Sequence, residues 1–321
     1  MVEVPSKLII TVAFQMKAKL DHGLFLGVYK LAGGFKVGSM SQLWCNGQWF
    51  NSVNFSVSPL DRGGILGLGL FETMLAVDGV PMFVPQHLAR LEASCQKLGW
   101  QLDLPDLKKT AAKLLVKNQL GTGRARVRLT VTAGSGTLRD LKLGPDHLVW
   151  MAALPAGNSP ACLTANLSPW PRNEYSPLAG LKCTSYAENL VALDHARRQG
   201  FEETIFLNTA GRLCEAATAN LFLVKNGTLL TPSLAAGCLP GIARQIVLEM
   251  AAGQGIACDE RSLGLGDLQT ADEVILTSAI HGPVCLSRFE EKSFNHSPVV
   301  EVLRKLWNDK LQPLRGSNKD V

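Results

Sequence analysis

The chain has 321 residues, of which 46% are hydrophobic and 18% charged, and its formal net charge is +5. This length suits two domains better than one, because single hydrophobic cores rarely grow beyond about 250–300 residues. The mild charge, without a dense block of lysine and arginine, gives no electrostatic sign of nucleic-acid or membrane-surface binding. No apolar run reaches the ~18 residues that a membrane-spanning helix needs.

Eight cysteines occur singly along the chain, and none belongs to a CxxC pair. This spacing argues against a zinc ribbon or a dithiol redox motif, so no metal site is predicted. Because no secretory signal precedes them, the cysteines are expected to be reduced and largely buried thiols of a cytoplasmic protein.

Residues 1–39 have no clear element boundaries and match neither a signal peptide nor an arginine-rich transit peptide. Regular patterns begin at Met40. We therefore expect residues 1–39 to be an N-terminal extension, either disordered or appended.

Strand signals dominate the first half of the chain. Asn46-Gly47 joins predicted strands at 43–45 and 48–50, and Asp78-Gly79 joins strands at 70–77 and 80–84, each in the manner of a two-residue hairpin. Helices are predicted from Pro85 to about residue 98 and from 105 to 120, and strands at 124–132 and 147–154. The strand at 124–132 alternates arginine with smaller residues, which is typical of a strand that is buried on one face.

Residues 155–160, Pro-Ala-Gly-Asn-Ser-Pro, have the composition of a linker. They divide the chain into a small domain at 40–154 and a large domain at 161–315. The patterns of the second part predict a strand at 162–167, a helix at 185–199, strands at 204–207 and 221–224, a hairpin at Asn226-Gly227, a helix at 240–251, a strand at 272–278 and a helix at 298–311. The expected fold class is α+β.

Six short motifs follow one another in the chain: SPLDRG at 58–63, GLFET at 69–73, HLARL at 87–91, LKCTSY at 181–186, CEAATANLF at 214–222 and GCLPGIAR at 237–244. Taken singly, Lys182 before a helix and Glu215 at the entry to a strand are ordinary solvated residues. In this order and spacing, from about residue 40 to about residue 288, the chain resembles the class IV aminotransferase family.

That resemblance implies a fold-type IV enzyme that uses pyridoxal 5′-phosphate (PLP). Its fold would resemble D-amino-acid aminotransferase, with a small α/β domain and a larger β-barrel-like domain with helices. The implied partners are a small-molecule amino substrate and a second copy of the chain in a homodimer.

The resemblance also assigns the two residues that act on the cofactor. Lys182 would form the Schiff base with the cofactor aldehyde and then move the α-proton of the substrate. Glu215 would face the pyridine nitrogen and keep it protonated, because a nearby negative charge favours the charged form of the ring. The small residues after Glu215 would let the backbone approach the ring closely.

Five further residues are assigned to cofactor binding. Arg90 would hold the phosphate with its planar guanidinium. The N–H groups near Ile242 and Ala243, at a helix N-terminus, would bind the same phosphate; related enzymes often have threonine in place of Ala243. Ser278 matches a further phosphate-side position, and Tyr186 is a candidate partner of the 3-hydroxyl group of the cofactor, although a packed helix aromatic remains an open alternative.

The family contains branched-chain aminotransferases, D-amino-acid aminotransferases and 4-amino-4-deoxychorismate lyase. Phe71, a candidate substrate-binding residue, stands where D-amino-acid aminotransferases tend to have tyrosine, and 214–217 lacks the Glu-Gly-Thr run of branched-chain enzymes. The stretch 182–222 is closest to the lyase, so we expect release of 4-aminobenzoate and pyruvate; the alternative is an aminotransferase acting on branched-chain or D-amino acids. Arg139 lies in a loop that holds substrate-carboxylate ligands in several members, but a solvated arginine is an equal alternative.

Overall fold

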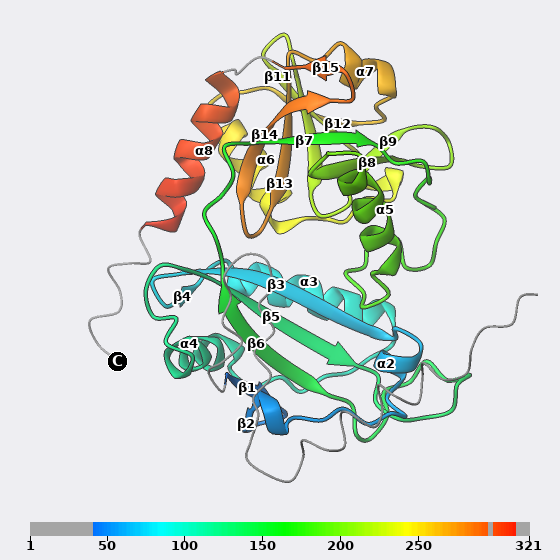
Figure 1. Cartoon of the computed structure of the whole chain (residues 1–321), viewed down its shortest axis with the longest axis vertical. Helices are drawn as coiled ribbons and strands as arrows, with labels where there is room; N and C mark the ends of the chain where they lie inside the picture. Colours follow the sequence, from blue (N-terminus) through cyan, green and yellow to red (C-terminus); the bar gives the residue numbers. More distant parts are fainter. Residues whose placement is uncertain (1–40, 295–297, 313–321) are drawn as a thin grey trace, which may run out of the picture. The chain divides into compact units, whose positions relative to one another are not determined.

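The computed structural model describes residues 41–294 and 298–312, so the extension expected at 1–39 lies outside the described range. The described residues belong to one compact unit, which contains two β-sheets (Figure 1). The first sheet is formed by residues 42–155 and the second by residues 162–293. The predicted linker at 155–160 connects the two sheets, and its role as a domain boundary stays a prediction.

The first sheet is antiparallel. Its six described strands are ordered β2 (Gln48–Asn51), β1 (Gln42–Cys45), β6 (Val149–Pro155), β5 (Arg124–Thr132), β3 (Gly69–Val77) and β4 (Val80–Pro81). Helix α3 (Val84–Lys97) packs against β3, and α4 (Leu107–Lys117) packs against β1 and β6 (Figure 1). Their apolar faces share one core with the sheet, in which Met74, Leu114 and Leu129 are almost fully buried.

Both predicted hairpins of this sheet are confirmed. Asn46 and Gly47 have φ values of 45° and 86°, and this pair of left-handed residues matches the twist of the flanking strands. The second hairpin is shorter than predicted. Phe83 adopts a φ of 54°, which ends the extended chain, and Val84 then begins α3 with Pro85 in its first turn.

The second sheet is mixed and curls into a half-barrel (Figure 1). Its strands are ordered β12 (Cys258–Arg261), β11 (Thr228–Pro232), β10 (Asn220–Lys225), β13 (Glu273–Ser278), β14 (Gly282–Phe289), β7 (Cys162–Leu167), β8 (Glu203–Leu207) and β9 (Leu213–Ala216). Strand β15 (Lys292–Ser293) pairs with β14. Helices α5 (Ala187–Arg198), α6 (Ile242–Gly253) and α8 (Pro298–Leu311) pack on β8, β13 and β14 respectively.

The expected α+β class and fold-type IV architecture are confirmed. The pattern missed the short helices α2 (Arg62–Ile65) and α7 (Leu265–Gln269) and the strands β9, β12, β14 and β15. The omission of β9 matters for the site, because Glu215 lies within this strand and not in a loop before β10. Residues 217–219, which we call the 217–219 turn, then connect β9 to β10.

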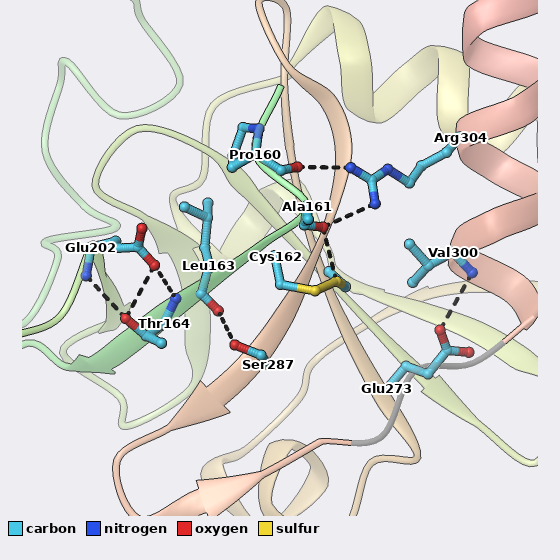
Figure 2. Close-up of a disulfide and its surroundings, with 11 residues drawn as sticks. Pro160, Ala161, Cys162, Leu163, Thr164, Glu202, Glu273, Ser287, Val300 and Arg304 are labelled. Atoms are coloured by element: carbon cyan, nitrogen blue, oxygen red, sulfur yellow. Dashed lines mark hydrogen bonds between the residues drawn. A yellow bond between two sulfur atoms is a disulfide. The ribbon is translucent and has the colours of Figure 1, made fainter. Parts of the chain in front are cut away.

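One expectation about the cysteines is wrong. Cys162 and Cys285 form a disulfide between β7 and β14, where they lie opposite each other in the parallel register (Figure 2). They are 123 positions apart in the chain, so their spacing could not reveal that the sheet brings them together. The other six cysteines are free, and all but Cys183 and Cys258 are buried.

Within residues 41–294 and 298–312, no helix has the length and apolar character needed to cross a membrane. The same residues contain no cluster of three or more histidine, cysteine, aspartate or glutamate side chains suited to a metal ion.

Candidate active site

A cavity of about 720 Å³ is lined by residues from both sheets. Strands β3 and β5 contribute from the first sheet, and the second contributes the 217–219 turn, the start of α6 and the end of β13. Eight of the nine residues singled out from the sequence line this cavity: Phe71, Arg90, Lys182, Tyr186, Glu215, Ile242, Ala243 and Ser278. The ninth, Arg139, is exposed and does not line it, so its proposed contact with substrate stays a prediction.

Lys182 lies beside β3, to which its backbone is tied. Its carbonyl accepts a hydrogen bond from the Phe71 N–H (2.8 Å), and the next residue forms a bridge with Leu70. The Lys182 Nζ lies 4.5 Å from the centre of the Phe71 ring. Burial lowers the pKa of Lys182 to about 8, and the positive charge of Arg90 acts in the same direction. An amine that loses its proton near neutral pH is suited to act as nucleophile and as proton carrier.

Glu215 points into the cavity from β9 with two partners. Its Oε2 accepts a hydrogen bond from the Leu239 N–H (2.9 Å), and its Oε1 lies 3.8 Å from Nη2 of Arg172. Burial raises the pKa of Glu215, while the charge of Arg172 works against this rise. Arg172 is itself held by a hydrogen bond to Glu188 (2.8 Å) and stacks on Phe206, with 4.3 Å from Cζ to the ring centre. Sequence reasoning missed Arg172, because nothing in its loop distinguishes it from a solvated arginine.

Arg90 is fixed in orientation by a buried carboxylate. Its Nε and Nη2 donate to the two oxygens of Glu72 (2.8 and 2.6 Å), and its Nη1 donates to the Pro240 carbonyl (3.0 Å). Burial alone would raise the pKa of Glu72, but hydrogen bonds from His87 and Arg90 and the charge of Arg90 hold it below its usual value. Glu72 therefore accepts at 2.6 Å from Nδ1 of His87, which carries the hydrogen. The result is a guanidinium held at the end of the loop that leads into α6.

The N-terminus of α6 opens into the same cavity. No side chain caps this helix, and the N–H groups of a first helical turn have no partner within the helix. Such N–H groups can bind an anion, and the helix dipole would favour its negative charge. Gly241 at the N-cap permits the close packing here, since a Cβ at this position would lie 1.9 Å from Oδ1 of Asn220. Asn220 in turn donates to the Leu239 carbonyl (2.8 Å).

Two arginines of β5 line the cavity from the first sheet. The Cζ of Arg128 lies 3.7 Å from the centre of the Phe71 ring, and Arg126 is two residues away on the same face of the strand. In the described part of the chain, neither makes an ion pair with a carboxylate. Sequence reasoning recognised their alternation as a strand with one polar face but did not connect that face with the site.

Tyr186 lines the cavity, but its hydroxyl is already engaged. It donates to the Ala217 carbonyl (2.9 Å), and burial raises the pKa of Tyr186 to about 12. The phenol therefore stays protonated at neutral pH, and its proposed contact with the cofactor would use the remaining lone pairs of the oxygen.

Comparisons with known proteins agree with this geometry. Residues 69–287 match the family model described as amino-transferase class IV. An aminodeoxychorismate lyase of Bacillus subtilis is 28% identical over 257 residues (78% of this chain and 88% of the relative). A branched-chain-amino-acid aminotransferase of Escherichia coli is 27% identical over 248 residues (73% and 80%). A solved aminotransferase from Brucella abortus, bound to PLP, has a TM-score of 0.75 at 24% identity (84% and 98%). The chain therefore belongs to the class IV aminotransferase family, and its cofactor is PLP.

The residues present fit this cofactor. PLP carries an aldehyde, a pyridine nitrogen and a phosphate, and the cavity offers a group of matching chemistry for each. Lys182 supplies an amine with a lowered pKa, Glu215 supplies a carboxylate, and Arg90 lies beside an uncapped helix N-terminus. When bound, the cofactor withdraws electrons from the bond that is broken at the substrate.

Proposed function

We propose that this chain is a PLP-dependent lyase that converts 4-amino-4-deoxychorismate to 4-aminobenzoate and pyruvate. The observation that carries the proposal is the pair of arginines, Arg126 and Arg128, that face the cavity without a carboxylate partner in the described chain. The substrate has two carboxylates, and a planar guanidinium is well suited to bind a carboxylate.

The charge of the cavity wall supports an anionic substrate. Six lysine or arginine side chains but only two glutamates line the cavity: Arg90, Arg126, Arg128, Arg172, Lys182 and Arg197 against Glu188 and Glu215. Arg90 and the α6 N-terminus would neutralise the cofactor phosphate. The arginines of β5 remain for the substrate. The two carboxylates of 4-amino-4-deoxychorismate could pair with both arginines, whereas a branched-chain amino acid has one carboxylate and would leave one guanidinium beside an apolar side chain.

Within the proposed reaction, this chain supplies binding groups and a proton carrier. Arg128 and Arg126 would bind substrate carboxylate, and Lys182 Nζ would take the proton from the carbon that bears the amino group. Loss of this proton and rupture of the carbon–oxygen bond release enolpyruvate and leave an aromatic ring. The enolpyruvate would take up one proton at its methylene carbon to become pyruvate. The atoms balance without an oxidant, a reductant or a second substrate.

The alternative is a PLP-dependent aminotransferase acting on branched-chain or D-amino acids. The identity to the branched-chain enzyme of Escherichia coli, 27%, is close to that of the lyase of Bacillus subtilis, 28%, and this favours keeping both candidates. An aminotransferase must return its amino group to a 2-oxo acid, and a lyase needs no such acceptor.

The need for an acceptor separates the two proposals. Purified protein loaded with PLP and given 4-amino-4-deoxychorismate alone should release pyruvate, which lactate dehydrogenase and NADH detect. The Lys182→Ala variant should release none, while the Lys97→Ala variant, which alters a lysine outside this cavity, should match the wild type. Amino transfer that requires a 2-oxo acid, with no pyruvate in its absence, would contradict the lyase and support the alternative.

We further propose a homodimer, a cytoplasmic location and a domain boundary at 155–160. The likeness to family members supports the first two. The Cys162–Cys285 disulfide of the structure counts against the cytoplasmic location, because thiols are mostly reduced in that compartment. Light scattering on the purified protein tests the dimer, and a monomer at micromolar concentration would contradict it.

A further inference from the structure

Glu203 is a buried carboxylate to which the preceding description gives no role. It begins β8, and only 3% of its surface is exposed. Its Oε1 accepts from the N–H groups of Thr204 (3.0 Å) and Ala217 (3.1 Å). Its Oε2 accepts from the Thr218 N–H (3.2 Å) and from the Thr218 hydroxyl. Three of these four hydrogen bonds therefore go to the 217–219 turn.

Two residues at the start of α5 bind the carbonyl group of the same turn. The Ala217 carbonyl accepts from the Tyr186 hydroxyl (2.9 Å) and from Nδ2 of Asn189 (2.7 Å). Glu203 thus binds the N–H groups of the turn, while Tyr186 and Asn189 bind its carbonyl. Ala217 also packs in a small core with Phe206, and its N–H donates to the Thr204 carbonyl (3.0 Å) as well. The side-chain hydrogen bonds of Glu203, Tyr186 and Asn189 add to these contacts and orient the turn.

The turn is part of the cavity wall. Residues 215–220 all line the cavity, and so do Tyr186 and Asn189. Glu215 precedes the turn by two residues, and Asn220, which packs against the start of α6, follows it directly. A displacement of the turn would therefore move the carboxylate and the phenol that face the interior.

We propose that Glu203 is a positioning residue for the cofactor. It fixes the 217–219 turn, and through this turn it sets where Glu215 and Tyr186 meet the bound PLP. This inference rests on the proposed roles of Glu215 and Tyr186. Glu203 itself does not line the cavity, so it acts through the turn and not by contact.

The charge of Glu203 adds to its geometric effect. Burial raises the pKa of Tyr186 and of Glu215, and the negative charge of Glu203 acts in the same direction on both. Removal of this charge would make both groups more acidic, so the electrostatic surroundings of the cofactor would change together with its position.

The test compares Glu203→Gln with Glu202→Gln in the full-length protein. Glutamine keeps the size of the side chain but turns one acceptor into a donor that faces N–H groups of the turn. Glu202 is a matched control because it is adjacent but exposed, and it accepts from the N–H (3.0 Å) and hydroxyl (3.3 Å) of Thr164, as Figure 2 shows. Thr218→Val provides a milder change in the same network.

Three quantities are measured for each variant: the visible absorption band of bound PLP at fixed pH, the dissociation constant of PLP, and Tm. For Glu203→Gln we expect a displaced or weakened band and a dissociation constant about tenfold to a hundredfold higher. Thr218→Val should change both in the same direction by a smaller factor, and Glu202→Gln should change neither. If Glu203→Gln does not fold, the band and dissociation constant of Thr218→Val decide the outcome.

A lower Tm with a wild-type band and wild-type PLP affinity in both network variants would overturn the inference, because Glu203 would then stabilise the fold alone. These readouts need no substrate. A wild-type protein that binds PLP but releases no pyruvate would contradict the proposed lyase. The inference about Glu203 would still be tested by the absorption band and PLP dissociation constant of the Glu203→Gln and Thr218→Val variants.

Discussion

The lowered pKa of Lys182 predicts how the cofactor-free protein takes up PLP. Only the neutral amine can bond to the cofactor aldehyde, so the uptake rate should follow the neutral fraction of this lysine. Burial and the charge of Arg90 lower its pKa from 10.5 to about 8. At pH 7 about 9% of the amine is then neutral, against about 0.03% for an ordinary lysine, a ratio of roughly 300.

The structure also fixes the sign of two perturbations. Arg90→Met removes a positive charge that favours the neutral amine, so the midpoint of the rate profile should move up by about 0.5–1 pH unit. Glu215→Gln removes a negative charge that favours the protonated amine, so its midpoint should move down. Lys97→Met removes a positive charge that is not among the influences on Lys182, and its midpoint should match the wild type.

The assay is stopped-flow absorbance of the cofactor-free protein mixed with PLP, from pH 6 to 10. Arg90→Met and Glu215→Gln should change the plateau rate as well, since both residues are proposed cofactor ligands, but the midpoint does not depend on the plateau. A wild-type midpoint near 10.5, or a downward shift in Arg90→Met, would refute the reasoning from burial and charge.

Three further predictions concern substrate binding, pH and the disulfide. Arg128→Met should raise KM for 4-amino-4-deoxychorismate by about tenfold to a hundredfold with an unchanged PLP band; an unchanged KM would remove Arg128 from the substrate site. The pKa of Glu72 is held below its usual value, so this residue adds stability at neutral pH that is lost as pH falls. The wild type should therefore lose more free energy of unfolding than Glu72→Gln between about pH 5 and pH 3, as urea titrations can show, and equal losses would contradict the prediction. The Cys162–Cys285 bond closes a loop of 123 positions, so joint replacement by serine should lower the free energy of unfolding by about 3–5 kcal/mol; no change would mean that the bond does not form in solution.

The sequence predicted those parts of the site whose residues belong to a motif within one short stretch of the chain. Lys182, Glu215 and the start of α6 lie in compact motifs, and the structure brings all of them to one cavity. The strands at 124–132 and 162–167 were predicted to the residue, because alternation and turn residues mark their ends. Patterns of this kind depend only on neighbours in the chain.

The residues that sequence reasoning missed depend on contacts between distant segments. Glu72 binds Arg90 from 18 positions away, and Glu203 binds Thr218 from 15. The partner of Cys162 is further still. Glu72 lies in the GLFET motif, but nothing in that motif identifies Arg90 as its partner. Glu203 and Cys285 belong to none of the six motifs, and each acquires its contact only when the sheet brings it beside its partner.

The distribution of charge in the cavity links the cofactor to the choice of substrate. Arg90 and the α6 N-terminus place positive charge at one part of the wall, and Arg126 and Arg128 place it on β5. Lys182 and Glu215 also line the wall, so the two groups that we expect to act on the cofactor share one cavity with both cationic regions. A phosphate satisfies the first region. The second remains for a ligand with its own negative charge. A branched-chain amino acid offers one carboxylate to the two arginines, so desolvation of the remaining unpaired guanidinium would count against it. This distribution of charge supports the dicarboxylate substrate that we propose.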